Sequence, residues 1–186
     1  MRTLGADRLE QCLTLRPTLI GIGSRWHADD AAGPAVISRV SGCVAATCID
    51  AGDAPERHLG EVIEGGPDAI LLLDAVDFGG VPGEIAVFGV DELPGRLSTT
   101  HTSSLRLLMR YLRAESGCDV LLVGIQPASV AFGEPMSAAV TASVDALAGL
   151  LEAKLGGRAA AALTSALAPE ISSARSQNGG QDHSWR

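Results

Sequence analysis

Two acidic residues and a histidine, in three separate stretches of the chain, could together form a metal site or a catalytic site. Asp30 closes the acidic loop of "GIGSRWHADDAAGP", Asp74 ends the apolar run "AILLLDAV", and His101 follows "STT". Two carboxylates and one imidazole leave coordination positions open, which suits a borderline divalent metal such as nickel, zinc or manganese. Structural roles are also open: Asp30 could cap the helix that follows, Asp74 could accept hydrogen bonds from turn amides, and His101 could be an exposed first-turn residue.

The hydrophobic pattern predicts strands that alternate with helices. The expected strands cover 17–23, 43–50, 69–76, 84–90 and 119–126, and the expected helices cover about 31–40, 56–64, 102–116 and 137–155. The run 69–76 is apolar throughout, as is typical of a strand covered on both faces. Its short connection to 84–90 favours an antiparallel hairpin, because a parallel return needs roughly a dozen or more residues. The chain is therefore predicted to be α/β: a single three-layer domain with a twisted, mostly parallel five-stranded sheet, an antiparallel edge strand and helices on both faces.

This architecture would bring residues that are distant in the sequence to one place. Ligands of open α/β sheets bind beyond the carboxyl ends of the strands. We therefore expect Asp30, Asp50, Asp74 and His101 to gather at that edge, while His27 is expected to be exposed to solvent.

The domain is expected to cover 17–156, preceded by an N-terminal extension (1–16) and followed by an Ala/Gly/Ser-rich tail (157–186) that is expected to be disordered. Helical spacing predicts buried faces at Leu105, Leu108 and Leu112 and at Val140, Val144, Leu147, Leu151 and Leu155.

Composition excludes several classes of function. The chain has 186 residues and a formal net charge of -8, which argues against a nucleic-acid surface. No stretch approaches the roughly 18 uninterrupted apolar residues of a spanning helix, so no membrane insertion is expected. The charged start lacks the core of a signal peptide. None of the cysteines (Cys12, Cys43, Cys48, Cys118) forms a CxxC motif, which favours reduced thiols in a cytoplasmic protein.

Familiar catalytic and cofactor motifs do not fit. A dinucleotide fingerprint that starts at Gly21 and Gly23 would need a third glycine where Trp26 stands. A phosphoacceptor receiver domain would need a lysine at the end of the last strand, but the single lysine, Lys154, lies in the last expected helix. The chain has neither a GxSxG nor an HExxH motif, so any hydrolysis must depend on the acids and His101.

Several motifs taken in order resemble one known family. They are "GIGSRWHADDAAGP", "DAGDAPE", "LLLDAVDFGGVPGEI", "TTHTSSL" and "LVGIQPASVAFGEPMS", within residues 18–155. The chain resembles the hydrogenase maturation endopeptidases, which remove a C-terminal peptide from the large subunit of nickel–iron hydrogenases, and most closely the formate-hydrogenlyase-type branch. The family's metal-contacting positions match Asp30, Asp74 and His101, and its fold is a twisted α/β sheet covered on both faces. The loop departs from the family pattern at Ser24 and Ala31.

The resemblance implies a protease that cuts only after nickel has been inserted into the precursor of the large subunit. The nickel would arrive on the substrate's cysteines, and Asp30, Asp74 and His101 would complete its coordination. The nucleophile would be a metal-activated water, or a carboxylate would act as base. No organic cofactor is implied. The alternative is a non-catalytic chaperone or binding module of flavodoxin-like shape that docks on a hydrogenase subunit and leaves its length unchanged.

Overall fold

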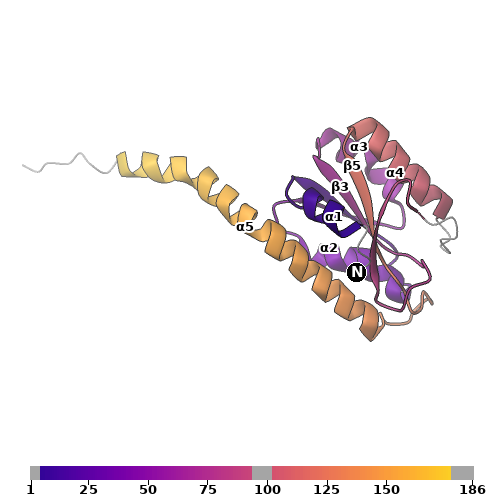
Figure 1. Cartoon of the computed structure of the whole chain (residues 1–186). Coiled ribbons are helices and arrows are strands. Elements are labelled where there is room, and N and C mark those ends of the chain that lie inside the picture. Colours follow the sequence, from indigo (N-terminus) through magenta and orange to yellow (C-terminus); the bar gives the residue numbers. More distant parts are fainter. Residues whose placement is uncertain (1–4, 94–101, 177–186) are drawn as a thin grey trace, which may run out of the picture.

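Five strands form one sheet in the order β2-β1-β3-β5-β4 (Figure 1). The computed structural model describes residues 5–93 and 102–176. The strands are β1 (Pro17–Ile22), β2 (Thr47–Gly52), β3 (Ala69–Ala75), β4 (Ile85–Gly89) and β5 (Asp119–Ile125). The α-helices are α1 (Ala6–Cys12), α2 (Ala32–Val40), α3 (Leu59–Glu64), α4 (Thr102–Ser116) and α5 (Ala138–Ser176), and short 3-10 helices η2 (Ala28–Ala31) and η3 (Pro55–His58) precede α2 and α3.

The pairing of the strands confirms the predicted fold class. β2, β1, β3 and β5 are parallel neighbours, and β4 runs antiparallel along β5 at the edge of the sheet. The carboxyl ends of the four parallel strands therefore share one edge. Asp74 lies opposite Gly124 of β5, and Asp50 lies opposite Gly21 of β1.

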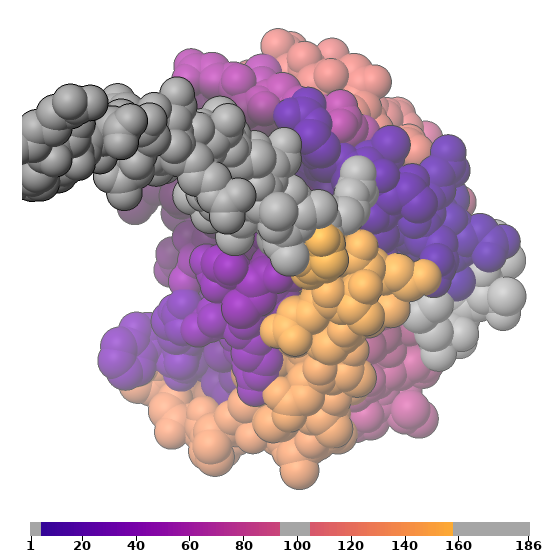
Figure 2. All heavy atoms as spheres, turned by 90° about the vertical axis from the view of Figure 1, so that its left-hand side faces the viewer, coloured from indigo at the N-terminus to yellow at the C-terminus, as the bar shows by residue number. Residues whose placement is uncertain are grey.

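Alternate strand residues enter two separate apolar clusters, one on each face of the sheet. Leu71 and Leu73 pack with residues of α1, α2 and α5, whereas Ile70 and Leu72 pack with residues of α3 and α4. Both faces are thus covered, as the apolar run of β3 predicted. α5 lies between α1 and α2 (Figure 2) and buries the predicted face, Val140, Val144, Leu147, Leu151 and Leu155. On α4, Leu105 and Leu112 are buried as expected, but Met109 is buried where Leu108 is only partly so.

The N-terminal extension contains a helix that packs on the domain. Leu9, Cys12 and Leu13 of this segment are buried in the cluster beneath α1. Their spacing of three and four residues is that of a helix face. A salt bridge of 2.8 Å between Glu10 and Lys154 connects α1 to α5. α1 is therefore part of the folded domain.

Strand β2 begins four residues later than the predicted 43–50. Residues 43–46 form a turn that contacts the middle of α5, where the Ala45 N–H donates to the carbonyl of Leu155 (3.2 Å). Val44 is buried there. The apolar residues of this stretch thus pack against a helix and are not paired in the sheet. Hydrophobicity alone does not distinguish these two roles.

Helix α5 continues to Ser176, beyond the expected helix end at about residue 155 (Figure 1). This part of the chain is rich in alanine, the residue with the highest intrinsic helix propensity. The prediction weighed the lack of apolar periodicity above that propensity. Residues 177–186 lie outside the described part of the chain.

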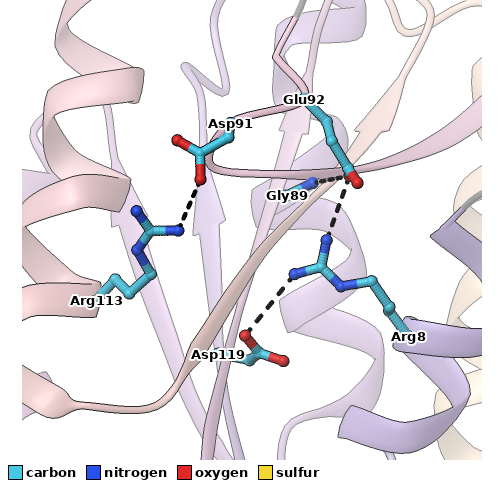
Figure 3. Close-up of polar contacts among 6 residues, drawn as sticks. All are labelled: Arg8, Gly89, Asp91, Glu92, Arg113 and Asp119. Carbon is cyan, nitrogen blue, oxygen red and sulfur yellow. Dashed lines mark hydrogen bonds and ion pairs between the residues drawn. The ribbon is translucent and has the colours of Figure 1, made fainter.

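Ion pairs join four elements at the edge of the sheet opposite the carboxyl ends (Figure 3). Arg8 of α1 lies 3.3 Å from Glu92, in the turn after β4, and 3.7 Å from Asp119 at the start of β5. Arg113 of α4 lies 3.0 Å from Asp91 in the same turn. Exposed pairs of this kind contribute about 0–1 kcal/mol each, so their main effect is to position the turn against α1 and α4.

Candidate functional site

Asp74 is a buried carboxyl group at the carboxyl end of β3. Its residue is 7 % exposed, and its own neighbour Ala75 donates a backbone hydrogen bond to it. Burial, and then the nearby charge of Asp30, raise the pKa of Asp74 well above its usual range. The two predicted acids therefore lie close enough to repel each other at this edge of the sheet.

Asp30 is half-buried in η2 and folds its side chain back onto the loop. Its Oδ2 accepts a hydrogen bond of 2.6 Å from the Ser24 N–H. The N-cap residue of α2 is Ala31, and no side chain caps that helix. The predicted capping role of Asp30 is therefore wrong, because its carboxylate satisfies the start of the loop instead of the start of the helix.

Glycines allow the acidic loop to lie directly against the strand ends. Gly23 has φ 127°, and a Cβ there would overlap with the backbone carbonyl of Asp30. A Cβ on Gly33, in the first turn of α2, would overlap with the carbonyl oxygens of Leu73 and Ile22. This close approach of α2 to β1 and β3 places Asp30 beside Asp74.

Asp29, a residue that the sequence analysis did not select, connects the acidic loop to the loop 126–137. Its side chain is fully buried and accepts three backbone hydrogen bonds: from Ala128 (2.7 Å), Ser129 (3.1 Å) and Ser137 (2.6 Å). Burial acts to raise the pKa of Asp29, but the three hydrogen bonds outweigh it and leave the pKa below its usual value. The partners lie about a hundred residues away in sequence, so no local signal indicates them.

Gln126 likewise uses its side chain to hold a loop in place, here the connection between β3 and β4. Its Oε1 accepts the N–H groups of Phe78 and Gly80, each at 3.0 Å, and its Nε2 donates to Asp77 Oδ1 at 3.0 Å. The sequence analysis also missed this residue, which is buried at the carboxyl end of β5. We call Asp30 and Asp74 the acid pair. Asp29 and Gln126 together fix the loops at the same edge of the sheet as the acid pair.

Three further residues were considered in the sequence analysis: His101, Asp50 and His27. His101 lies outside the described residues; α4 begins at the next residue, Thr102. Asp50 lies at the end of β2 and forms an ion pair with Arg25. His27 is half-buried, contrary to expectation, with its Nδ1 2.9 Å from Ser24 Oγ. Among the residues whose side chains the structure describes (5–93 and 105–157), no three His, Cys, Asp or Glu side chains come together as a metal site.

Comparison with known proteins identifies the family. Residues 39–154 match a family model described as hydrogenase maturation protease. The hydrogenase 3 maturation protease of Escherichia coli (strain K12) is 34 % identical over 133 residues, which cover 68 % of this chain and 83 % of that protein. The chain belongs to the hydrogenase maturation protease family. The stretch that matches the family model begins after the acidic loop, so that match does not depend on Asp30.

Solved structures of hydrogenase maturation proteases have the same architecture. A crystal structure of a [NiFe] hydrogenase maturation protease from Thermococcus kodakarensis KOD1 superimposes with a TM-score of 0.73 at 29 % identity, over 80 % of this chain and 98 % of that one. A crystal structure of the hydrogenase 3 maturation protease gives a TM-score of 0.68 at 31 % identity, over 77 % and 94 % of the two chains.

Membership of the hydrogenase maturation protease family makes the chain a peptidase, which decides against a purely non-catalytic binding module. No helix among the described residues has the length and hydrophobicity needed to cross a membrane.

Proposed function

We propose that this protease removes the C-terminal extension of a nickel–iron hydrogenase large-subunit precursor after nickel insertion, and that Asp30, Asp74 and His101 recognise the nickel. The observation that supports this most strongly is the pair of acids at the carboxyl edge of the sheet, buried Asp74 and half-buried Asp30. The charge of Asp30 acts on Asp74, whose own burial already disfavours its ionised form. A divalent cation would relieve both effects, because it compensates the two negative charges where water cannot.

The nickel in this proposal belongs to the substrate. Structural zinc sites close a shell of four ligands that are usually cysteine or histidine. Two carboxylates and one imidazole are too few to close a shell, and they suit an ion that is already held by the precursor's cysteines. The protease would supply the missing ligands, and no resident metal or organic cofactor is needed.

Recognition of the nickel would also position the peptide bond to be cut. A carbonyl next to a Lewis acid is polarised, which favours attack by a nucleophile. That nucleophile is either a water that the metal activates or a water from which a carboxylate removes a proton. The buried position of Asp74 keeps bulk water away on the side of β3. Cleavage would thus require the nickel, which makes the protease a checkpoint for metal insertion.

The test measures the mass of the precursor. Chelator-treated protease is mixed with the nickel-loaded precursor of a hydrogenase 3-type large subunit, and with the nickel-free precursor with and without zinc. We expect shortening of the nickel-loaded precursor alone. Asp30→Asn, Asp74→Asn and His101→Ala should abolish it, and Glu152→Gln, which changes an exposed acid on α5, should not.

Folding must be measured in parallel. Asp74→Asn should not lower the melting temperature, because it replaces a buried carboxyl group, whose ionised form is disfavoured, with a neutral group of nearly the same shape. Two results would contradict the proposal: cleavage of nickel-free precursor by a protease that retains a stoichiometric metal, or full activity of a folded Asp74→Asn variant.

A further inference from the structure

Two neighbouring loops at the carboxyl edge of the sheet expose large apolar side chains. Trp26 is 72 % exposed, Phe132 is 74 % exposed and Val130 is 53 % exposed. The loops touch each other: the Gly133 N–H donates to the carbonyl of Trp26 (2.8 Å), and the ring of His27 meets the ring of Phe132 edge-on at 5.3 Å. We call Trp26, Val130 and Phe132 the apolar rim.

The apolar rim is held in place by buried polar contacts. The Asp29 carboxylate binds three backbone N–H groups of the loop 126–137, and the Asp29 N–H donates to the carbonyl of Ser129 (3.1 Å). Ser129 Oγ also donates to Glu134 at 3.0 Å. The rim is therefore ordered although its side chains are in water. A pre-ordered surface loses less conformational entropy when it binds a partner.

The position of the apolar rim ties it to the acid pair. Trp26 and Asp30 belong to the same short loop after β1, and the loop of Val130 and Phe132 follows β5. Strand β3, which ends in Asp74, lies between β1 and β5 in the sheet. A substrate that presents nickel to the acids would therefore continue across these loops.

We propose that the apolar rim binds an apolar segment of the large-subunit precursor next to the peptide bond that is cut, so that Trp26 and Phe132 determine substrate affinity. This inference rests on the proposed function. The rim residues carry no charge, and the nearby carboxylate of Glu134 and the guanidinium of Arg25 already have partners in Ser129 and Asp50. An apolar segment is thus the occupant that matches the rim.

The size of the apolar rim argues against a second copy of the chain as occupant. Stable dimers bury about 20–30 residues on each side, whereas the rim consists of a few side chains. A few side chains suffice for the hot spot of a peptide, where Trp and other aromatic residues contribute most.

The first experiment separates binding from chemistry. The Trp26→Ser/Phe132→Ser double variant is compared with wild type in steady-state cleavage of nickel-loaded precursor. We expect KM to rise by about tenfold or more, while kcat stays within about twofold, because the interaction is made equally in the ground state and the transition state. Leu107→Ser is the matched control: Leu107 is 69 % exposed on α4, and its loss should change neither constant.

The second experiment observes binding directly. The chain contains two tryptophans, Trp26 and Trp185, so a Trp185→Phe variant isolates the emission of Trp26. Addition of nickel-loaded precursor in which every tryptophan is replaced by phenylalanine should shift this emission to shorter wavelength, because the indole leaves water. The double variant should have the same melting temperature as wild type, since its changed side chains are exposed.

The outcomes separate this inference from the proposed function. If wild type does not shorten the nickel-loaded precursor, the proposed function fails. If wild type cleaves but the folded double variant has an unchanged KM, the rim does not bind substrate and the inference is overturned. Self-association of wild type that the double variant loses, with KM unchanged, would assign the rim to a second copy and would equally overturn it.

Discussion

Adjacent acids in one loop have different environments, and only one of them was visible from residue types and spacing. Asp30 and Asp74 could be selected from the sequence because acids at strand ends meet at one edge of a parallel sheet. Asp29 could not, because its function depends on backbone groups of a distant loop. A paired "DD" shows that two carboxylates are present; packing decides that Asp29 is buried as an anchor, whereas Asp30 accepts the Ser24 N–H and its charge acts on Asp74.

The cysteines should differ in reactivity. Burial, and then the charge of Asp119, raise the pKa of the Cys12 thiol from its ordinary value of 9.0 to about 11, whereas Cys43 is exposed. We expect iodoacetamide at about pH 8 to modify Cys43 in the folded protein and to spare Cys12 until urea unfolds the chain, because the thiolate is the nucleophile. Peptide mass mapping before and after unfolding checks this.

The same pKa shift predicts the sign of a pH effect on stability. The pKa of Cys12 is higher in the folded chain than in the unfolded chain, so the protonated thiol stabilises the fold. This contribution is fully present below pH 9, the pKa of the unfolded chain, and is lost as the pH rises from about 9 to about 11. The free energy of unfolding of wild type should fall over that interval more than that of Cys12→Ala. Equal slopes for the two proteins, or rapid alkylation of folded Cys12, would contradict the assignment.

Most elements could be predicted from the sequence, and those that could not share a physical cause. β3 and β5 were recognised because their apolar runs pack on both faces, and the antiparallel β4 followed from a connection too short for a crossover. The predicted start of β2 was wrong because Val44 is buried in the cluster that includes α5 and the Ala45 N–H bonds to α5 instead of to a neighbouring strand. The predicted end of α5 was too early, because the alanine-rich stretch after residue 155 has a high intrinsic helix propensity and needs no apolar periodicity to be helical.

Helix α2 approaches the sheet so closely that one of its glycines cannot carry a side chain. A Cβ on Gly33 would overlap with backbone oxygens of β1 and β3, which cannot move without breaking the sheet. Gly33→Ala should therefore lower the free energy of unfolding by about 1–3 kcal/mol or more, as overpacking does. It should also impair cleavage, because it pushes the acidic loop away from Asp74.

Gly149 of α5 is the matched control. A Cβ there meets nothing within 4 Å, so Gly149→Ala should raise the free energy of unfolding by about 0.5–1 kcal/mol through helix propensity alone. Urea denaturation of both variants is the measurement. A Gly33→Ala protein as stable as wild type would mean that α2 does not lie against β1 and β3 as described.

In the whole molecule, buried side chains that bind loop backbone gather at the carboxyl edge of the sheet. At the amino edge of the parallel strands, exposed ion pairs fasten the turn after β4 to α1 and α4. At the carboxyl edge, buried Asp29 and Gln126 order the loops around the acid pair. Exposed pairs tolerate substitution, whereas buried hydrogen-bonded groups do not. Substitutions of polar residues are therefore expected to destabilise the fold more at the carboxyl edge than at the amino edge.

The length of α5 raises the question of how much of this helix the folded domain needs. Its described core residues end at Leu155, although the helix continues to Ser176. Removal of 158–186 should therefore change the free energy of unfolding by less than about 0.5 kcal/mol and leave cleavage of nickel-loaded precursor unchanged. Removal from residue 151 onward also deletes Leu151 and Leu155 and should cost about 2–5 kcal/mol for each. Thermal and urea unfolding of the two truncated chains measure both effects. If the shorter deletion were as harmful as the longer one, the distal part of α5 would have to contact the domain or a second copy, and the boundary at 156 would be wrong.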